Sequence, residues 1–387
     1  MRTILKYLKG DTVIWIIAIL LMAVSLLCVY SFVPILVRTE GGSPIGYLFK
    51  HFIYILIGGL VMYWIHLQDP KIIEKLSKFI FVVTIGLLIF TFFFGVSINN
   101  ATRWVRVPII GLTFQSSDFA KLALIIFLSH RLVSKKDQLN SWKEGFIPVV
   151  LPIIIICGLI AKDNFSTAAL LFLISVVLLF LAKIPFGKFI TFIGSGIAIL
   201  GVAILINLVF PVLNLLPRFD TWMNRIFNAY GDKSTSGSMQ AIKAKLAISN
   251  GGFTGVGVGQ GELKRYTPQA YADFFYSSFV EEFGFIAALF LVALYMILFY
   301  RIFRIALNAK TLFETYVAIG IGLLILSAAT INMFVCTGIM PVTGQNMPFL
   351  SMGGSAMIMN CIALGIVLAI SRKNKEELGL SDANKLK

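Results

Sequence analysis

Long apolar segments recur along almost the whole of this 387-residue chain. A helix needs about 20 predominantly apolar residues to cross the hydrocarbon core of a bilayer, and runs of that length occur repeatedly. Hydrophobic residues make up 58% of the chain and charged residues 13%, with a mean hydropathy of +0.90. We predict an all-α polytopic membrane protein with ten transmembrane helices, at roughly 13–36, 49–67, 77–96, 116–133, 146–162, 165–183, 188–211, 275–304, 313–337 and 347–371.

Basic residues are distributed unevenly between the two sets of predicted loops. The termini and the loops on their side carry twenty Lys and Arg residues, whereas the short loops on the other face carry five. Because Lys and Arg in short loops favour the cytoplasmic side, we predict that both termini are cytoplasmic. The same rule accounts for the formal net charge of +15, which in a soluble chain would suggest a nucleic-acid partner.

One long hydrophilic connection, at 212–274, interrupts the apolar pattern between predicted spans seven and eight. The predicted orientation places it outside the cytoplasm, and loops of this length are often functional. Within it, apolar residues at helical spacing predict a short amphipathic helix on the outer membrane surface. These residues are Met239, Ile242, Leu246 and Ala247. No internal repeat is visible, so we expect a single membrane domain over 1–387.

A glycine-rich run from Gly251 to Gly261 lies in this loop. No βαβ pattern surrounds it, which argues against a nucleotide-binding loop. Glycine allows a backbone to approach another group closely, so we predict a compact turn against a ligand. Lys264 and Arg265 follow this run, and both suit an anionic group such as pyrophosphate. The alternative is that these two side chains lie among lipid headgroups.

Asp273 stands directly before predicted span eight, among aromatic residues. Desolvation at a membrane surface would raise the pKa of its carboxyl, which suits a general base. Asp is also a preferred helix N-cap, so both roles stay open at this point. Glu281 and Glu282 lie further into the same span, where charged side chains are costly and tend to mark function.

Predicted span four begins with two opposite charges, Asp118 and Lys121. At i and i+3 they share a helix face and can pair. Burying one charge in a span costs roughly 2.5–3.5 kcal/mol on insertion scales, and pairing would offset this. Arg103, Trp104 and Arg106 precede them on the same predicted face, as a further candidate site or as an interfacial belt.

Cysteine and histidine residues offer no metal or redox site. The cysteines lie within apolar runs without C-x-x-C spacing, so we expect them to pack as small hydrophobes. The histidines share no motif, and no Ser-His-Asp set is visible. The residues concerned are Cys28, Cys157, Cys336, Cys361, His51, His66 and His130.

Taken in order, these stretches resemble the SEDS family of shape, elongation, division and sporulation proteins over nearly the whole chain. Each motif alone is loose, but five in this order are specific. The stretches are Asn100–Trp104 (family pattern N-G-x-R-R-W), Gln115–Lys121 (Q-P-S-E-L-A-K), Gln240 with Ile248–Gly259 (Q…A-I-G-x-G-G…G-x-G-x-G), Ala272–Gly284 (T-D-F…E-E-L-G) and Pro341–Ser355 (P-T-G-x-x-L-P-x-x-S-Y-G-G-S). The short chain and the motif pattern favour the FtsW branch over the RodA branch.

One stretch departs from the family pattern. Many members show E/Q-P-D-x-G-T-A where this chain has Lys162–Ala168, with the acidic residue shifted or lost. No catalytic role is therefore carried over to that stretch.

The resemblance implies a peptidoglycan glycosyltransferase that polymerises lipid II at the outer face of the bacterial cytoplasmic membrane, at the division septum. An acceptor sugar hydroxyl would attack C1 of MurNAc on the growing chain, and undecaprenyl pyrophosphate would leave with inversion. Asp273 would be the general base, and a divalent cation such as Mg²⁺ or Mn²⁺ would assist the cationic side chains. The expected substrate-binding residues are Arg103, Trp104, Asp118, Lys121, Lys264, Arg265, Glu281 and Glu282.

The same resemblance implies partners: lipid II, the growing glycan strand, a class B penicillin-binding protein, division proteins and membrane lipids, with no nucleic acid. A lipid II flippase is the main alternative, since charged residues within spans suit both activities. A flippase should offer a polar path through the whole bilayer, whereas this chain gathers its unusual polar residues in the outer half. A scaffold for division proteins would leave Asp273 and Lys121 without a purpose.

Overall fold

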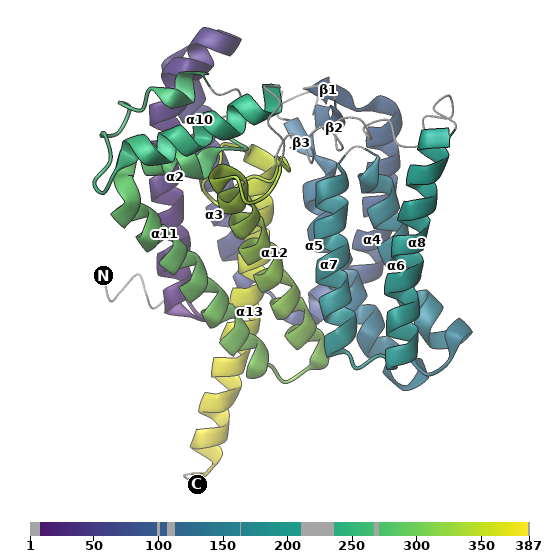
Figure 1. Ribbon diagram of the computed structural model, residues 1–387. Coiled ribbons are helices and arrows are strands. Elements are labelled where there is room, and N and C mark those ends of the chain that lie inside the picture. The colour runs from purple at the N-terminus through teal and green to yellow at the C-terminus, as the bar shows by residue number, and fades with distance from the viewer. Residues whose placement is uncertain are drawn as a thin grey trace.

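Long helices dominate the computed structural model of this protein, and most of them run along the same axis (Figure 1). The structure describes residues 8–98, 101–106, 113–162, 164–209, 236–266 and 271–385. The helices are α2 (Thr12–Glu40), α3 (Pro44–His66), α4 (Pro70–Phe94), α5 (Ser116–Ser134), α6 (Ile147–Ala161), α7 (Phe165–Leu181), α8 (Phe186–Val209), α10 (Ser236–Gly251), α11 (Phe275–Leu307), α12 (Leu312–Thr337) and α13 (Gly354–Lys385). Short turns of 3-10 or π helix cover Lys136–Gln138, Trp142–Phe146 and Leu263–Tyr266.

The prediction of a polytopic membrane protein is confirmed at the level of fold. Within the described ranges, eight helices are long and apolar enough to cross a membrane: α2, α3, α4, the segment that ends with α6, α8, α11, α12 and α13. Of the other two predicted spans, α7 is apolar but has only 17 residues. α5 has 19 residues and carries both Asp118 and Lys121 near its start. Each predicted range thus contains a helix.

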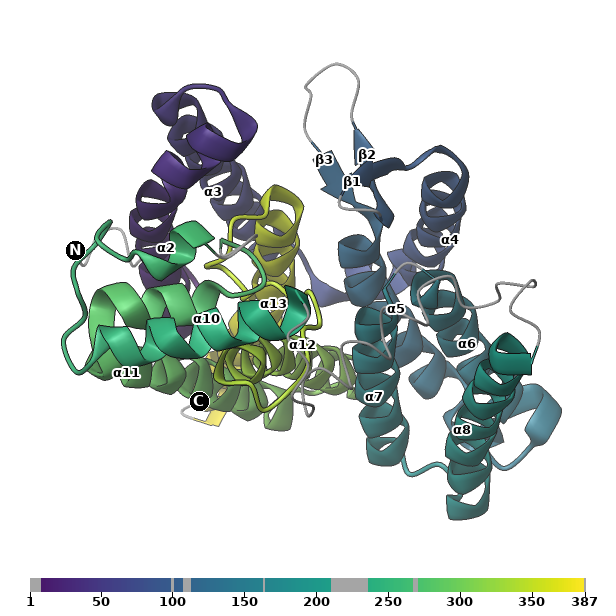
Figure 2. The same cartoon turned by 45° about the horizontal axis from the view of Figure 1, so that its top comes forward.

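The helices form two groups that meet along α5, α7 and α12 (Figure 2). In one group, α13 packs against α3, α11 packs against α12, and α2 contacts both α3 and α11. In the other, α4 packs against α5, and α6 packs against α5 and α7. Apolar side chains such as Phe93 and Phe94 point outward and are 70% and 71% exposed. An apolar exterior of this kind suits contact with lipid.

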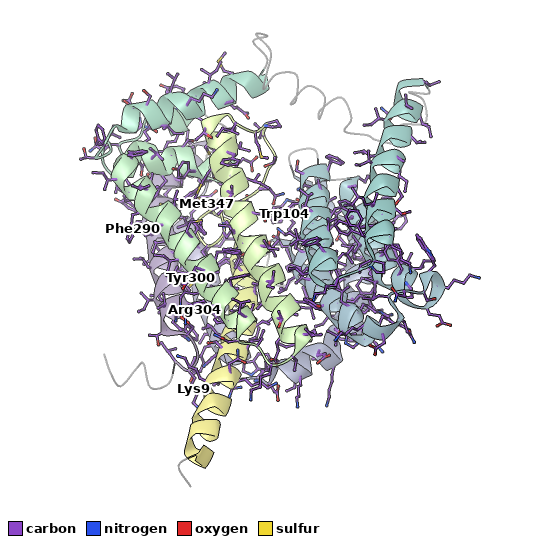
Figure 3. The ribbon with its side chains drawn as sticks, turned by 60° about the horizontal axis from the view of Figure 1, so that its bottom comes forward. Lys9, Trp104, Phe290, Tyr300, Arg304 and Met347 are labelled. Atoms are coloured by element: carbon purple, nitrogen blue, oxygen red, sulfur yellow. The ribbon has the colours of Figure 1, made fainter. Side chains whose placement is uncertain are left out.

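Two opposite ends of the bundle differ in character. The sheet and α10 lie at one end, called here the loop end, and the C-terminal part of α13 projects from the other (Figure 1). At that second end, Arg301 Nε donates to Asp11 Oδ2 at 3.0 Å, and Lys373 Nζ donates to Glu314 Oε1 at 2.7 Å. In Figure 3, Phe290, Tyr300 and Arg304 follow one another along α11 toward that end, where Lys9 also lies.

A small antiparallel sheet at the loop end corrects the all-α prediction. Its strands are β1 (Val96–Ile98), β2 (Ala101–Arg106) and β3 (Thr113–Gln115), in the order β1-β2-β3. Their three to six residues are too short for a clear alternating pattern, which is why the sequence did not reveal them. The register pairs Trp104 with Gln115, the residue that precedes α5.

The last predicted span also begins later than expected. Residues 347–353 form turns rather than helix, and α13 starts at Gly354. Ser351 Oγ accepts from the N–H of Met347 at 2.8 Å and donates to the carbonyl of Ala272 at 3.2 Å. These bonds replace the helical ladder with a folded loop, which is called here the 341–353 loop.

The predicted amphipathic helix is present as α10, which packs on α11 and α12. Its buried face consists of small residues, since Ala244 and Ala247 are almost completely covered. Met239, Ile242 and Leu246 point away and are each about half exposed. Ala247 therefore belongs to the buried face and not to the exposed apolar stripe with which it was grouped.

The glycine-rich run lies against the backbone of α11, and its approach to a ligand stays a prediction. α11 is interrupted at Gly284, which has a φ of 81°. The N–H groups of Phe285 and Ile286 bond to the carbonyls of Gly252 and Phe253 at 2.9 and 3.2 Å, and Val256 N–H bonds to Glu281 O at 2.9 Å. The loop thereby supplies partners for the groups that the helix break releases, which buried backbone requires.

Candidate functional site

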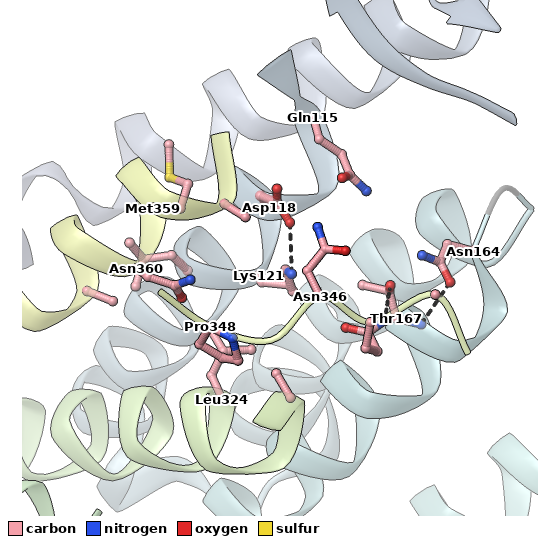
Figure 4. Close-up of a pocket in the computed structure, with 16 residues that line it drawn as sticks. Gln115, Asp118, Lys121, Asn164, Thr167, Leu324, Asn346, Pro348, Met359 and Asn360 are labelled. Carbon is pink, nitrogen blue, oxygen red and sulfur yellow. Dashed lines mark hydrogen bonds and ion pairs between the residues drawn. The ribbon is translucent and has the colours of Figure 1, made fainter. Parts of the chain in front are cut away.

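A polar cavity opens near the loop end, between α5, α7, α12, α13 and the 341–353 loop (Figure 4). Its polar lining comes from four separate parts of the chain, which the fold brings together. Apolar side chains of α5, α12 and α13 close the remaining sides. The polar and glycine lining residues are Gln115, Asp118, Lys121, Asn164, Thr167, Gly344, Gln345, Asn346 and Asn360.

The predicted ion pair forms one wall of this cavity. Lys121 Nζ lies 2.8 Å from Asp118 Oδ1, and the two side chains are only 18% and 7% exposed. Ser355 Oγ, at the start of α13, donates to the other carboxylate oxygen of Asp118 at 3.1 Å. Asp118 also lies in the first turn of α5, where the helix dipole favours a negative charge. These contacts fix the ammonium group of Lys121 at the cavity surface.

The facing wall is uncharged. Gln345 Nε2 donates to Thr167 Oγ1 at 2.6 Å, which ties the 341–353 loop to α7. Asn164 is the N-cap of α7, and its Oδ1 accepts from the N–H of Thr167 at 3.2 Å. The neighbouring residue Asp163, whose position relative to the family pattern was in question, lies outside the described residues.

Asp273 lies beside this cavity, next to Gly344. A methyl group placed on Gly344 would lie 4.0 Å from each of the two carboxylate oxygens of Asp273, and Gly344 itself lines the cavity. The N-cap of α11 is Phe274, and no side chain makes a cap hydrogen bond there. Asp273 therefore does not occupy the N-cap position itself, and its side chain is partly exposed.

A buried asparagine that the sequence analysis missed holds Asp273 and the cavity wall together. Asn332 of α12 is 1% exposed. Its Nδ2 donates to the carbonyls of Gln345 at 2.9 Å and Asp273 at 3.1 Å, with Ala272 O at 3.3 Å. Its Oδ1 accepts from the N–H of Tyr276 at 3.3 Å. One amide thus joins α11, the residues before it and the 341–353 loop.

Lys264 and Glu282 pair with each other away from the cavity. Their side chains are 2% and 4% exposed and form a salt bridge, and Lys264 Nζ also donates to the carbonyl of Ser31 at 3.0 Å. The ammonium lies 5.5 Å from the ring centre of Phe32. Since this cation is buried and neutralised, the geometry favours a structural role for Lys264 over the predicted contact with pyrophosphate.

Glu281 likewise serves the glycine-rich loop. Its Oε1 accepts from Glu262 N–H at 3.0 Å and from Asn250 Nδ2 at 3.2 Å. The residue is fully buried. Neither Glu281 nor Glu282 lines the polar cavity, so the two acids belong to the packing of α11 against its loop.

The remaining predicted residues lie at the loop end, and those whose side chains the structure describes do not line the cavity. Arg265 is exposed, in the short helical turn after the glycine-rich loop. Arg103 and Trp104 are neighbours in β2, and the register of the sheet places Trp104 beside Gln115, a cavity residue. The side chain of Arg103 and the residue Asn100 lie outside what the structure describes.

Comparison with known proteins decides the family. A family model described as cell cycle protein, which covers FtsW, RodA and SpoVE, matches residues 11–376. The chain belongs to this family. The resemblance inferred from the five motifs is therefore confirmed.

Curated relatives of the chain carry two kinds of name. A protein of Geobacter sp. (strain M18) named probable peptidoglycan glycosyltransferase FtsW is 30% identical over 371 residues, which are 94% of this chain and 97% of that protein. The stage V sporulation protein E of Bacillus subtilis (strain 168) is 30% identical over 375 residues, covering 96% and 99%. These matches span nearly the full length of this chain and of each relative.

Solved structures share the fold. A chain of a peptidoglycan synthase complex, from work on the coordination of polymerization and crosslinking, superposes with a TM-score of 0.73 at 21% identity, covering 94% of this chain and 98% of that one. The rod shape determining protein RodA of Thermus thermophilus superposes with a TM-score of 0.67 at 20% identity, covering 94% and 97%. The family fold is thus present from α2 to α13.

Proposed function

We propose that this protein is a peptidoglycan glycosyltransferase that polymerises lipid II. Its family and the names of its relatives support this activity, and the membrane helices suit a lipid-linked substrate. The observation that carries the proposal is the place of Asp273: a partly exposed carboxylate just before α11, beside the wall of a polar cavity that holds a fixed ammonium.

The proposed topology has ten spans, with α5 and α7 completing the set, and both termini in the cytoplasm. The excess of basic residues on the side of the termini supports it, and a helix lies in each predicted range. The loop end, with the cavity, then faces outside the cytoplasmic membrane.

In the proposed step, the carboxylate of Asp273 takes the proton from the C4 hydroxyl of the acceptor GlcNAc. The oxygen attacks C1 of MurNAc at the end of the growing chain, the bond from C1 to the pyrophosphate oxygen breaks, and undecaprenyl pyrophosphate leaves. The configuration at C1 inverts because the attacking and leaving oxygens occupy opposite faces. Lys121, whose ammonium Asp118 holds at the cavity surface, contacts the substrate there.

The cations for the departing pyrophosphate are proposed to be Arg103 and Arg265, which lie at the loop end. A divalent cation such as Mg²⁺ or Mn²⁺ would add Lewis-acid stabilisation of that leaving group. Among the described residues, no three His, Cys, Asp or Glu side chains gather at one point. We therefore expect such a cation to arrive with the pyrophosphate, and the proposed proton transfer does not depend on it.

The proposed partner is a class B penicillin-binding protein, which would crosslink the strands that this chain makes. The fold shared with a chain of a peptidoglycan synthase complex supports this assignment. Growing glycan strands, other division proteins and membrane lipids complete the proposed set of partners, with the bacterial cytoplasmic membrane at the division septum as the site of action.

The test is the Asp273→Asn variant, which removes the base while keeping the size of the side chain. Glycan-strand formation from labelled lipid II, with the purified protein and its transpeptidase partner, should fall by about 10²–10⁴-fold, the usual contribution of general acid–base catalysis. Asp137→Asn, at an exposed acid of the opposite end, is the matched control and should remain active.

Two results would contradict the proposal. A folded Asp273→Asn variant with normal polymerisation would remove Asp273 from the reaction. A parent protein that moves lipid II between leaflets of vesicles, yet forms no glycan with its partner present, would favour the flippase alternative.

A further inference from the structure

The polar cavity carries no net charge. Its only charged lining residues are Asp118 and Lys121, as far as the described chain shows, and they form an ion pair with each other. Every other polar side chain that lines it is an amide or a hydroxyl: Gln115, Asn164, Thr167, Gln345, Asn346 and Asn360. A pyrophosphate brought into this space would lose its hydration without meeting an unpaired cation, which is costly.

Two of these amides point into the cavity and have no partner within the described residues. The side chains of Asn346 and Asn360 lie on either side of Lys121 in Figure 4. Thr167, Gln345 and Asn164, in contrast, bond to one another across the facing wall. Because each amide offers two N–H donors and one acceptor oxygen, Asn346 and Asn360 together present a full set of unused hydrogen-bonding groups beside a fixed ammonium.

We infer that this cavity binds an uncharged, N-acetylated sugar ring of the substrate, and not its pyrophosphate, with Asn346 and Asn360 as the residues that recognise it. The N–H of an acetamido group can donate to an asparagine carbonyl, and its C=O can accept from an asparagine N–H. Sugar hydroxyls can bond to either end of the asparagine amide. The apolar part of the lining, which includes Leu122, Leu324 and Met359, suits the apolar face of a sugar ring and the acetyl methyl group.

The amides at positions 345 and 346 are a feature of this chain's sequence and not of the family pattern. Gln345 and Asn346 occupy the two unspecified positions of the P-T-G-x-x-L-P pattern, so the family motif does not prescribe an amide at either one. Gly353 leaves room for Asn346, because a Cβ added at Gly353 would lie 3.2 Å from Asn346 Nδ2. The inference rests on the proposed function for the identity of the substrate, and on the cavity alone for its chemical class.

The experiment measures binding of soluble probes to the purified full chain in lipid nanodiscs. The probes are N,N′-diacetylchitobiose, cellobiose, which carries C2 hydroxyls in place of the acetamido groups, and inorganic pyrophosphate. The parent protein should bind diacetylchitobiose more tightly than the other two. Asn346→Leu and Asn360→Leu keep the side-chain volume and should each raise the Kd for diacetylchitobiose about five- to tenfold, the effect of losing about one hydrogen bond.

Asn308→Leu is the matched control, since Asn308 is exposed at the C-terminus of α11 and its loss should leave the Kd unchanged. Thermal unfolding of each variant verifies that it is folded. Asn346→Asp serves as a second variant that keeps an acceptor oxygen but loses the N–H donors, and it should weaken binding without loss of fold.

The outcomes separate this inference from the proposed function. Unchanged affinity in both leucine variants, a parent that prefers pyrophosphate, or a parent that binds no disaccharide would each overturn the sugar subsite. A parent that binds diacetylchitobiose through Asn346 and Asn360, but forms no glycan from lipid II, would support the subsite and contradict the polymerase.

Discussion

Replacing Asn332 by leucine should disable the site without touching the substrate. Leucine has a similar shape but removes every hydrogen bond of the amide, which joins Asp273, Gln345 and Tyr276. A buried polar group left without a partner costs about 1–3 kcal/mol. Since two carbonyls and the N–H of Tyr276 lose their partner, the free energy of unfolding should fall by about 3–9 kcal/mol.

The Asn332→Leu change should also lower activity, because Asn332 holds the backbone of Asp273 in place. Without Asn332, nothing on α12 holds the carbonyl of Asp273 against the 341–353 loop, and misplacing a reacting group by about 1 Å can cost about 10²-fold in rate. We expect kcat for polymerisation to fall by about this factor while KM for lipid II changes little. Asn332→Asp keeps the acceptor for Tyr276 N–H but loses the donors, and it should resemble the leucine variant.

A double-mutant cycle distinguishes positioning from a general loss of stability. Once Asp273 is replaced by asparagine, adding Asn332→Leu should reduce the residual rate little further, because both changes remove the same function. Asn374→Leu is the control: this buried asparagine bonds to Ile305 O at the other end of the bundle, and its loss should affect stability but not kcat. A folded Asn332→Leu protein with the parent's kcat would refute the argument.

Three further predictions concern the loop end. Gly255 and Gly259 share a φ of 81°, but a Cβ on Gly255 would overlap the carbonyl of Glu282 while Gly259 faces open space; Gly255→Ala should therefore lower the yield of folded protein far more than Gly259→Ala, and equal yields would contradict the packing. Ser249 is exposed whereas three of the four native cysteines are buried, so in spheroplasts Ser249→Cys should react with an impermeant thiol reagent, and labelling only after lysis would reverse the topology. Lys264→Met strands the buried Glu282 and should destabilise by about 3–5 kcal/mol, whereas adding Glu282→Leu should restore both folding and polymerisation; a folded but inactive double variant would return Lys264 to the site.

Much of the fold follows from the length of the apolar runs alone, because a helix in a membrane must make its backbone hydrogen bonds within its own segment. This is why a helix lies in each predicted range, and why the pairing of Asp118 with Lys121 followed from their i, i+3 spacing. Residues 347–353 were wrongly predicted to be helical because side chains such as Ser351 hydrogen-bond to the backbone there, and hydrophobic periodicity does not reveal such bonds.

The site itself was only partly visible in the sequence. Asp273 was identified as an acid at a span boundary. Lys264 and Glu282 were predicted on similar grounds, as charged residues near that boundary, but in the structure they neutralise each other. These two residues are 18 positions apart, which is too far for a local sequence pattern to predict their pairing. Asn332 and Asn360 were overlooked as single polar residues within apolar runs, although an amide inside a membrane helix is itself a signal of function or tight packing.

The break in α11 has a consequence for how the chain is made. The partners of the released amides of Phe285 and Ile286 lie at Gly252 and Phe253, which leave the ribosome earlier than α11 does. In the proposed topology, the backbone groups on either side of the break at Gly284 therefore have no complete set of partners until the preceding loop has crossed the membrane and folded back. With that topology, insertion of this helix and translocation of its loop would be a single event in biogenesis, and the N-terminal turns of α11, which follow Asp273, would take their place only when that event is complete.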